Sequence, residues 1–253
     1  MKKFLTTFLA IFCLTSNFTV YGTSYIENVS KTYEEKFEEL KNLGIINCYE
    51  DGNFYPEKEI TRAEFSKMVA LISGYDGNYN IYNPEHYFHD VDIYHWANGH
   101  ISFCYENGIV DGVVAPEPVY GTSWDKSGVE VTEIVGYHNL ECTKFAPEKI
   151  ISYPECFKMV LRATGYTPRA EAMGGYPQGY VTEADMRPLI IAEKPDYKTN
   201  VTRKMAVEII YNALHLPLLV KKDTKPDENE EWYIADGTGD LEYITLYTKN
   251  FDL

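Results

Sequence analysis

The chain has 253 residues and a formal net charge of −15 at neutral pH, with 38 acidic residues against 23 basic ones. A negative field of this size repels nucleic acid and anionic lipid surfaces, so neither is expected as a partner. The length allows one large or two small domains with a real hydrophobic core.

The first segment has the pattern of a secretory signal peptide. Lys2 and Lys3 precede an apolar run from Phe4 to Leu14, and the small residue Gly22 suits signal peptidase. The apolar run of about 11 residues is shorter than the roughly 20 that a membrane-spanning helix needs. No later stretch is long enough to span a membrane. We therefore expect an exported, soluble mature protein that begins near Thr23 and has a net charge of −17 once the two lysines are removed.

An internal repeat follows. The stretches "FYPEKEITRAEFSKMVALISGY" (54–75) and "FAPEKIISYPECFKMVLRATGY" (145–166) align without a gap. They share Phe-x-Pro-Glu-Lys, Lys-Met-Val and a closing Gly-Tyr. A third, diverged copy, "NVTRKMAVEIIYNAL" (200–214), keeps a Thr-Arg pair. Self-similarity of this kind indicates a repeat architecture.

Each copy carries the signals of a helix start. Thr61 and Ser152 are expected N-caps, and Glu64 and Glu155 three residues later complete a capping box. In the third copy Met205 replaces the glutamate. The apolar residues behind Thr61 follow helical spacing, which predicts one buried face; they are Phe65, Met68, Val69 and Ile72.

A second kind of helix precedes the capped ones. One apolar stripe runs from Tyr33 to Gly44, and another from Trp96 to Gly108. In the third unit the first helix is expected over Val181–Ala192, with Pro188 as a break. The unit is thus helix, turn-rich loop and capped helix, and the protein is predicted to be mainly α.

These segments resemble the S-layer homology family. "FHDVDIYHWANGHISFCYENGIVDG" (88–112) is similar to that family's opening half, and "CYEDGNFYPEKEITRAEF" (48–65) to its closing half. "GGYPQGY" (174–180), with the third helix, resembles the last repeat of a subgroup found in surface proteins of anaerobic Gram-positive bacteria. The resemblance covers about 25–219.

The resemblance implies three helix-loop-helix units packed as a pseudo-threefold prism. Such modules attach exported proteins non-covalently to secondary cell-wall polysaccharide, often through a pyruvylated, carboxylate-bearing sugar held in grooves between repeats. This chain departs from the pattern at Asn28 and Tyr33 in the first unit and at Tyr153, in place of the arginine, in the second. The departures put at least one groove in doubt. Carried over by position, the glycan-binding residues are Arg62, Asp90, Trp96, Arg203, Asp51 and Gly52.

Arg62 has two interpretations. The start of a helix attracts anions, and an arginine there adds a planar donor fork for a carboxylate. Alternatively, Arg62 pairs with a neighbouring acid or covers apolar surface with its stem. Because Tyr153 takes its place in the second copy while the capping pair is kept, packing does not require an arginine at this position.

The other candidates also have structural alternatives. Trp96 could stack on a sugar ring or belong to the core. Asp90 is expected to cap the helix entered at Tyr94 to Ala97, with a sugar hydroxyl as an additional partner. Asp51 and Gly52 are expected to form a turn in which the glycine has positive φ.

No catalytic constellation or cofactor motif is present, so we expect neither an enzyme nor a cofactor. Four histidines cluster in sequence (His86, His89, His95 and His100), but their spacing matches no zinc pattern and no metal site is predicted. The mature cysteines lack a C-x-x-C spacing. Burial as free thiols is expected, although export would permit disulfides; they are Cys48, Cys104, Cys142 and Cys156.

Two segments fall outside the repeats. The insertion Val113–Glu141 is expected to form short strands that cover the edge of the second unit, with Trp124 lining or blocking a groove as the alternative. After an acidic linker, Trp232–Ala235 and Tyr243–Tyr247 predict a β-hairpin. The expected divisions are a signal peptide (1–22), repeats at 25–76, 85–166 (with the insertion 113–141) and 174–219, a linker (220–231) and the hairpin segment (232–253).

The sequence thus predicts a non-enzymatic protein, secreted to the cell surface or cell wall, that binds carboxylate-bearing secondary cell-wall polysaccharide. Other surface-layer proteins are further candidate partners. The alternative is a degenerate scaffold with a structural or protein-interaction role and no glycan binding.

Overall fold

The structure is a computed structural model, and it describes residues 23–77, 87–113, 117–124, 130–138, 144–187, 189, 198–221, 232–234 and 244–251. The predicted signal peptide, His86, Cys142, Pro188 and most of the predicted linker lie outside these residues.

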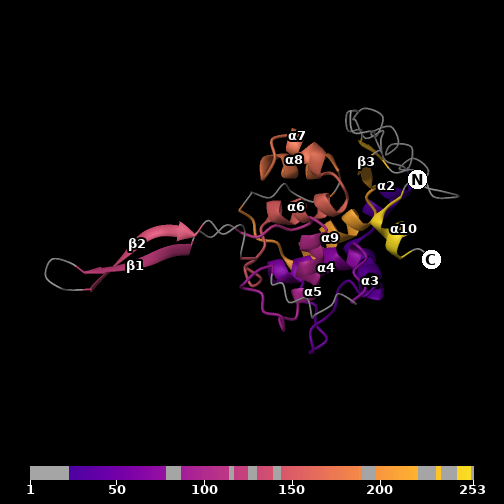
Figure 1. The fold of residues 1–253 in the computed structure, drawn as a ribbon. Helices are drawn as coiled ribbons and strands as arrows, with labels where there is room; N and C mark the ends of the chain where they lie inside the picture. Colours follow the sequence, from indigo (N-terminus) through magenta and orange to yellow (C-terminus); the bar gives the residue numbers. More distant parts are fainter. Residues whose placement is uncertain are drawn as a thin grey trace.

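Three capped helices form the centre of the helical body (Figure 1). They are α4 (Arg62–Ile72), α6 (Tyr153–Ala163) and α9 (Arg203–Leu214), and each contacts the other two. The mainly α prediction is confirmed. The apolar face predicted behind Thr61 is buried along its length, as the helical spacing requires.

The predicted caps are present. Glu64 N donates to Thr61 Oγ1 at 3.2 Å, and Thr61 N donates back to the Glu64 carboxylate at 2.9 Å. Glu155 likewise accepts from Ser152 N at 2.9 Å and from Ser152 Oγ at 2.7 Å. In the third copy, which has no glutamate, only the hydroxyl half of the cap remains. Each cap satisfies backbone donors that the helix itself leaves unpaired.

Each capped helix packs against an opening helix from another part of the chain. These are α3 (Tyr33–Asn42) on α9, α5 (Asn98–Glu106) on α4, and α8 (Gln178–Met186) on α6. The first and last units are therefore in contact, and the arrangement closes on itself. Two short helices, α2 (Thr23–Val29) and α7 (Thr167–Ala172), were not predicted.

The helix α8 differs from the predicted Val181–Ala192. It begins three residues earlier, at Gln178, and ends at Met186. Arg187 is extended, with φ −108° and ψ 115°. A residue that precedes proline is pushed out of the helical region by the proline ring, so the predicted break falls before Pro188.

Backbone hydrogen bonds join the segments in front of the three capped helices into a ring. Ile60 N donates to Val201 O (2.9 Å), Val201 N to Ile151 O (3.1 Å), and Ile151 N to Ile60 O (3.0 Å). All three side chains are buried. Because the ring uses the N–H and the C=O of every member, these buried polar groups are satisfied.

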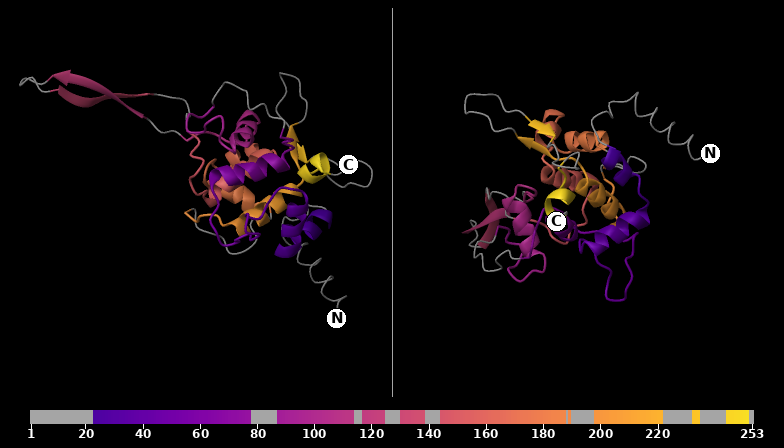
Figure 2. Two further views of the ribbon diagram at one scale, coloured as in Figure 1. Left: turned by 90° about the horizontal axis from the view of Figure 1, so that it is seen from below. Right: turned by 90° about the vertical axis from the view of Figure 1, so that its right-hand side faces the viewer.

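The insertion forms a two-stranded antiparallel ribbon of β1 (Glu117–Trp124) and β2 (Glu130–His138), with a register shift between Val119 and Tyr120. The ribbon projects away from the helices (Figures 1 and 2). Short strands were predicted correctly, but the expected covering of the second unit's edge is wrong. The strands satisfy each other's hydrogen bonds and pack against no described helix. The side chain of Trp124 lies outside the described part.

The predicted C-terminal hairpin is also wrong. β4 (Trp232–Ile234) pairs antiparallel with β3 (Leu219–Lys221), and Leu246–Asn250 is a helix, α10. Thr245 caps α10 by accepting a hydrogen bond from the third helical N–H at 3.1 Å. Leu246 is buried, and the Asn250 side chain donates to Ile72 O at 2.9 Å. The part of the chain predicted as the second strand therefore leads into a capped helix that packs against the helical body.

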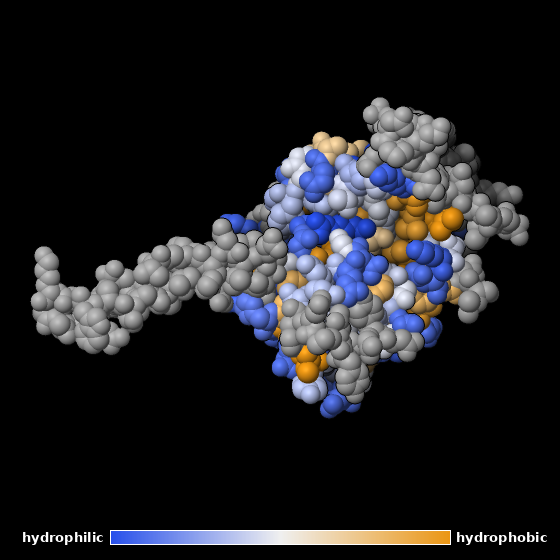
Figure 3. Space-filling view, in the orientation of Figure 1, coloured by the Kyte–Doolittle hydropathy of each residue, from blue (hydrophilic) through white to orange (hydrophobic). Residues whose placement is uncertain are grey.

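Cys104 and Cys156 are buried free thiols, as predicted, and Cys48 is a half-buried free thiol. Burial raises the pKa of the Cys104 thiol. Figure 3 shows a largely polar face, with hydrophobic residues gathered toward the side of β3 and α10. No described helix combines the length and hydropathy that a membrane crossing requires.

Gly165, two residues after the end of α6, offers a test of this packing. It has φ +87°, and a Cβ there would overlap the carbonyl oxygen of Leu219 in β3. Gly108 has φ +66° with open space around it. We expect Gly165→Ala to lower the free energy of unfolding by about 3 kcal/mol or more, and Gly108→Ala by about 1 kcal/mol. Urea denaturation followed by circular dichroism measures both; equal losses would contradict the contact between α6 and β3.

Candidate functional site

Two grooves lie at equivalent places around the central helices. The first encloses about 220 Å³ between α4, the loop after α3, the loop before α5 and the start of α9. Its floor is apolar, with Ile45, Ile46, Phe54, Ile60 and Met68, and its other lining residues are Asn47, Glu64, Lys67, Trp96 and Arg203. It thus combines an apolar surface with a few polar groups, which is typical of ligand sites.

Trp96 stands at the edge of this first groove. It is 54% exposed and lies outside α5, which begins at Asn98. The core interpretation of Trp96 is therefore wrong: the helix begins after it, so the apolar stripe does not carry it inward. The His95 ring stacks beside the indole with ring centroids 5.6 Å apart.

Arg203 forms one wall of the first groove. Its Nε donates to Phe54 O at 2.8 Å and its Nη2 to Asn47 O at 2.9 Å. The guanidinium lies over the Phe54 ring, 4.3 Å from its centroid, and Nη1 is 3.7 Å from the Glu64 carboxylate. Arg203 thus holds the loop that carries Asn47 and Phe54, with two of its five donors in hydrogen bonds to that loop.

Lys67 is the second positively charged residue that lines the first groove. It is half-buried, and within the part of the chain that the structure describes no hydrogen bond or ion pair engages its ammonium group. An ammonium carries three donors, so a ligand could take all of them.

The second groove, of about 140 Å³, is lined by corresponding residues between α6, the end of α5 and the start of α4. Asp111 replaces Asn47, Lys158 corresponds to Lys67, and Tyr176 stands where Trp96 does, two residues before the next helix. The remaining lining residues are Arg62, Ile109, Val110, Gly112, Val113, Glu155 and Met159.

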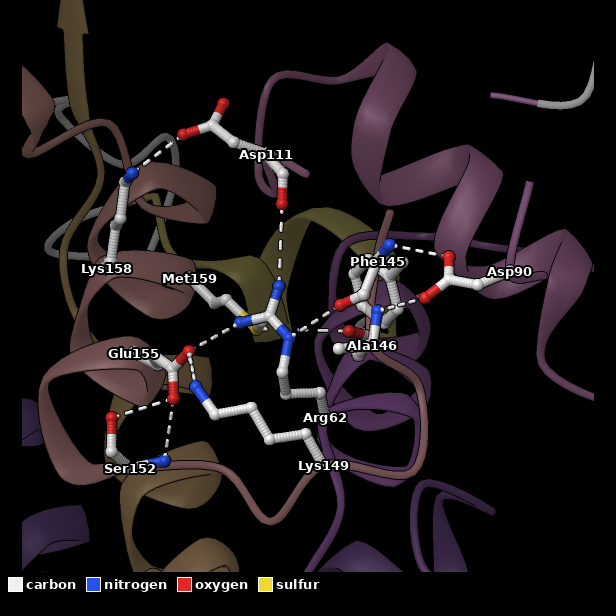
Figure 4. A network of polar contacts seen from close by, with 11 residues as sticks. Arg62, Asp90, Asp111, Phe145, Ala146, Lys149, Ser152, Glu155, Lys158 and Met159 are labelled. Carbon is white, nitrogen blue, oxygen red and sulfur yellow. Dashed lines mark hydrogen bonds and ion pairs between the residues drawn. The ribbon is translucent and has the colours of Figure 1, made fainter. Parts of the chain in front are cut away.

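Arg62 makes the same kind of contacts here that Arg203 makes in the first groove (Figure 4). Its Nε donates to Phe145 O at 3.0 Å and its Nη1 to Glu155 Oε1 at 2.9 Å. The guanidinium lies 4.7 Å from the Phe145 ring centroid, and Arg62 is only 5% exposed. Of the two interpretations of Arg62, this geometry matches the pairing with a neighbouring acid.

The expected anion site on the backbone at the start of α4 does not form. Arg62 N donates to Lys149 O at 2.9 Å, and Ala63 N donates to Pro147 O at 3.0 Å. In α9, Arg203 N and Lys204 N each donate to a carbonyl at 2.8 Å. Carbonyls of the neighbouring loops therefore occupy the donors that an anion would use.

Asp90 is a loop anchor. Its two carboxylate oxygens accept from Phe145 N at 2.7 Å and from Ala146 N at 2.8 Å (Figure 4). The predicted capping role is wrong, because Asp92 is the residue that accepts from Tyr94 N, at 2.8 Å. Ala146 has φ +59°, a conformation that costs energy for a residue with a Cβ. The two hydrogen bonds that Asp90 accepts, one from Ala146 and one from Phe145, hold the loop in this conformation.

Asp51 and Gly52 form the predicted turn. Gly52 has φ +81°, and Asp51 accepts hydrogen bonds from Asn53 N, at 2.9 Å, and from the Tyr55 hydroxyl. Both residues are exposed at the tip of the loop, and neither lines either groove.

The structure therefore brings Trp96 and Arg203 together in the first groove and places Arg62 in the second, with Asp90 behind it. Sequence reasoning missed Lys67, Asn47 and their equivalents as groove residues. The available signal was the Lys-Met-Val shared by both copies, which places Lys67 and Lys158 at the same helical position. Among the described residues, no group of three or more His, Cys, Asp or Glu side chains could hold a metal ion.

Comparison with known proteins supports the resemblance seen in the sequence. Residues 26–66 match the family model described as S-layer homology domain. The chain is 25% identical over 211 residues to a middle cell wall protein of Brevibacillus brevis, an alignment that covers 83% of this chain and 17% of the relative. It is 24% identical over 175 residues to a surface layer protein of Brevibacillus choshinensis (69% of this chain, 13% of the relative).

A third relative, cell surface glycoprotein 1 of Acetivibrio thermocellus, is 28% identical over 219 residues, which cover 78% of this chain and 8% of the relative. The chain thus spans less than a fifth of the length of each of these relatives. The match at 26–66 confirms the predicted resemblance to the S-layer homology family, and the predicted cell-surface localisation is confirmed with it.

The loop-anchoring role of Asp90 predicts an effect on stability. Asp90→Ala leaves the N–H groups of Phe145 and Ala146 without partners, and we expect it to lower the free energy of unfolding by about 2–3 kcal/mol. Asp92→Ala, in the same loop, removes one exposed bond and is expected to cost about 0.5 kcal/mol. Thermal or urea denaturation of the pair checks this. A similar small loss in both variants would contradict the anchoring role.

Proposed function

We propose that this protein is a non-enzymatic cell-surface protein that attaches to the envelope by binding secondary cell-wall polysaccharide in the first groove. The sugar would carry a pyruvate ketal, whose carboxylate is the anionic group recognised. Supporting this are the S-layer homology match over 26–66 and the relatives, all of which are named as wall or surface proteins.

The observation that carries the proposal is the pairing of Trp96 with Lys67 in one groove. An exposed indole offers a broad apolar face on which a pyranose ring can stack. A half-buried ammonium beside it offers donors for a carboxylate. Such a local charge is needed because the field of the whole protein is negative and opposes an acidic ligand.

The proposal includes the fold implied by the resemblance: three repeats, at 25–76, 85–166 and 174–219, as a pseudo-threefold prism. Its support is the cyclic order in which opening helices contact capped helices, together with the backbone ring through Ile60, Ile151 and Val201. Each groove then lies between the closing half of one repeat and the opening half of the next.

The remaining candidate residues take supporting roles in this proposal. Arg62, Arg203 and Asp90 hold the loops that form the groove walls, as their hydrogen bonds to Phe145, Phe54 and Ala146 indicate. Asp51 and Gly52 shape the loop tip; a direct contact with the glycan remains a prediction for them.

The alternative is a scaffold without glycan binding, in which surface-layer proteins are the partners. The second groove favours it, because its lysine and arginine are already paired with carboxylates. The first groove argues against it, because Lys67 has no such partner among the described residues.

Trp96→Ala tests the proposal. Because Trp96 is exposed, we expect the free energy of unfolding to change by less than about 0.5 kcal/mol. Losing a stacking surface worth about 1–2 kcal/mol should weaken binding about tenfold. The measurement is sedimentation of the protein with purified walls of a bacterium whose wall polysaccharide is pyruvylated, over a range of wall concentrations.

Tyr94→Ala is the matched control, since Tyr94 is 89% exposed in the same loop and lines neither groove. It should sediment like the wild type. Walls treated with mild acid, which removes pyruvate ketals, should retain little protein. A wild type that fails to sediment refutes wall binding, whereas a Trp96→Ala variant that binds like the wild type refutes the first groove as the site.

A further inference from the structure

We infer that the grooves are not equivalent: the first groove alone takes the anionic group, and Asn47, where the second groove has Asp111, decides this. The inference rests on the proposed function, and it names the anion-binding lysine as Lys67. It comes from comparing three positions that the fold makes equivalent.

The equivalence is defined by the caps. Lys67, Lys158 and Glu208 each lie six residues after an N-cap, namely Thr61, Ser152 and Thr202 respectively. In a helix this spacing places the three side chains at the same height and on the same face. Differences among them therefore reflect the chemistry of each site.

In the second groove the equivalent lysine, Lys158, is paired with a carboxylate. Lys158 Nζ is 2.7 Å from Asp111 Oδ2, and Arg162 Nη1 is 2.8 Å from Asp111 Oδ1. Burial by itself would raise the pKa of Asp111, but hydrogen bonds from Arg162 and Lys158 outweigh burial, and the pKa is lowered. Asp111 is therefore a carboxylate at neutral pH, and an incoming anion would meet a like charge.

The arginine of the second groove is neutralised as well. Glu155 Oε1 is 2.9 Å from both Arg62 Nη1 and Lys149 Nζ. The ionisable lining groups of this groove are then two cations, Arg62 and Lys158, and two carboxylates, Asp111 and Glu155. The formal charges of these four lining groups cancel, and the two carboxylates are also shared with Arg162 and Lys149, which do not line the groove.

At the third position the sign is reversed. Glu208 stands in place of the lysine, and its carboxylate is 3.4 Å from the buried Lys36 ammonium. Tyr153 stands in place of the arginine and is itself buried. The side chains that stand here at the lysine and arginine positions are therefore an acid and a tyrosine, and neither offers a cation to an acidic sugar.

The first groove keeps a positive charge. Its ionisable lining groups are Arg203, Lys67 and one carboxylate, Glu64, which lies 3.7 Å from the arginine. Asn47 presents an amide where the second groove presents a carboxylate, so within the described ranges no acidic side chain pairs with Lys67. A single carboxylate on a sugar that stacks on Trp96 satisfies this lysine and leaves no buried charge uncompensated.

The inference is tested by exchanging the deciding residue between the grooves. Isothermal titration calorimetry of full-length mature protein with a pyruvate-ketal methyl glycoside should give one site for the wild type. Asn47→Asp should raise the Kd at least about tenfold, because the new carboxylate pairs with Lys67 and repels the ligand. Asp111→Asn, which frees Lys158, should raise the stoichiometry from one toward two.

Two controls make the result specific. The methyl ester of the same glycoside, which has no charge, should bind wild type and Asn47→Asp equally. Asn107→Asp adds the same charge at an exposed position that lines neither groove, and its Kd should match the wild type. Thermal denaturation of each variant confirms folding, and Lys67→Met should reproduce the loss without adding a charge.

The outcomes separate this inference from the proposed function. If walls retain the wild type but Asn47→Asp and Lys67→Met bind the glycoside unchanged, or the wild type shows two sites, the inference is overturned while wall binding stands. A different outcome is that the glycoside binds the wild type at one site and Asn47→Asp abolishes this binding, while walls retain no protein. In that case wall attachment is refuted and the anion site is supported. No binding of either probe overturns both.

Discussion

The backbone ring through Ile60, Val201 and Ile151 is the constraint on which the rest of the structure depends. Each member donates to one neighbour and accepts from the other, so the three connecting segments fix one another's positions. The residues that follow are the N-caps, and a change in the ring would move the starts of all three central helices. The cap residues and the loop carbonyls then take up the helix donors that remain unpaired.

This cyclic arrangement also explains which loops the side chains of Arg62 and Arg203 contact. The first backbone N–H groups of α4 and α9 bond to loop carbonyls, which leaves the side chains of Arg62 and Arg203 directed at the next loop along the cycle. There each guanidinium lies over a phenylalanine ring and bonds the carbonyl of that same phenylalanine. An arginine suits this task because its planar fork can stack and donate at once. The groove walls are therefore built by residues that an anion-site interpretation had assigned to the ligand.

The same scaffold carries three positions with different charge. The central helices repeat their caps and their buried faces because packing demands them, whereas the surface residue six positions after the cap is Lys67, Lys158 or Glu208. What surrounds each of these residues determines its availability. Asp111 pairs with Lys158 and Lys36 with Glu208, whereas Asn47 has no carboxylate to pair with Lys67, which has no ion-pair partner in the described part of the chain. Only the first of the three positions combines an available cation with an exposed indole.

The sequence by itself determined the capped helices, the turn at Asp51 and Gly52 and the buried thiols. These features depend on neighbours along the chain, so spacing and residue type are enough to predict them. Tertiary structure decided the partners: that Asp90 anchors Phe145 and Ala146, that β4 pairs with β3, and that Trp96 and Lys67 share a groove with Arg203. The reason is physical. These contacts join residues far apart in the chain, and whether a charge is free or neutralised depends on which neighbour the fold places within about 3 Å of it.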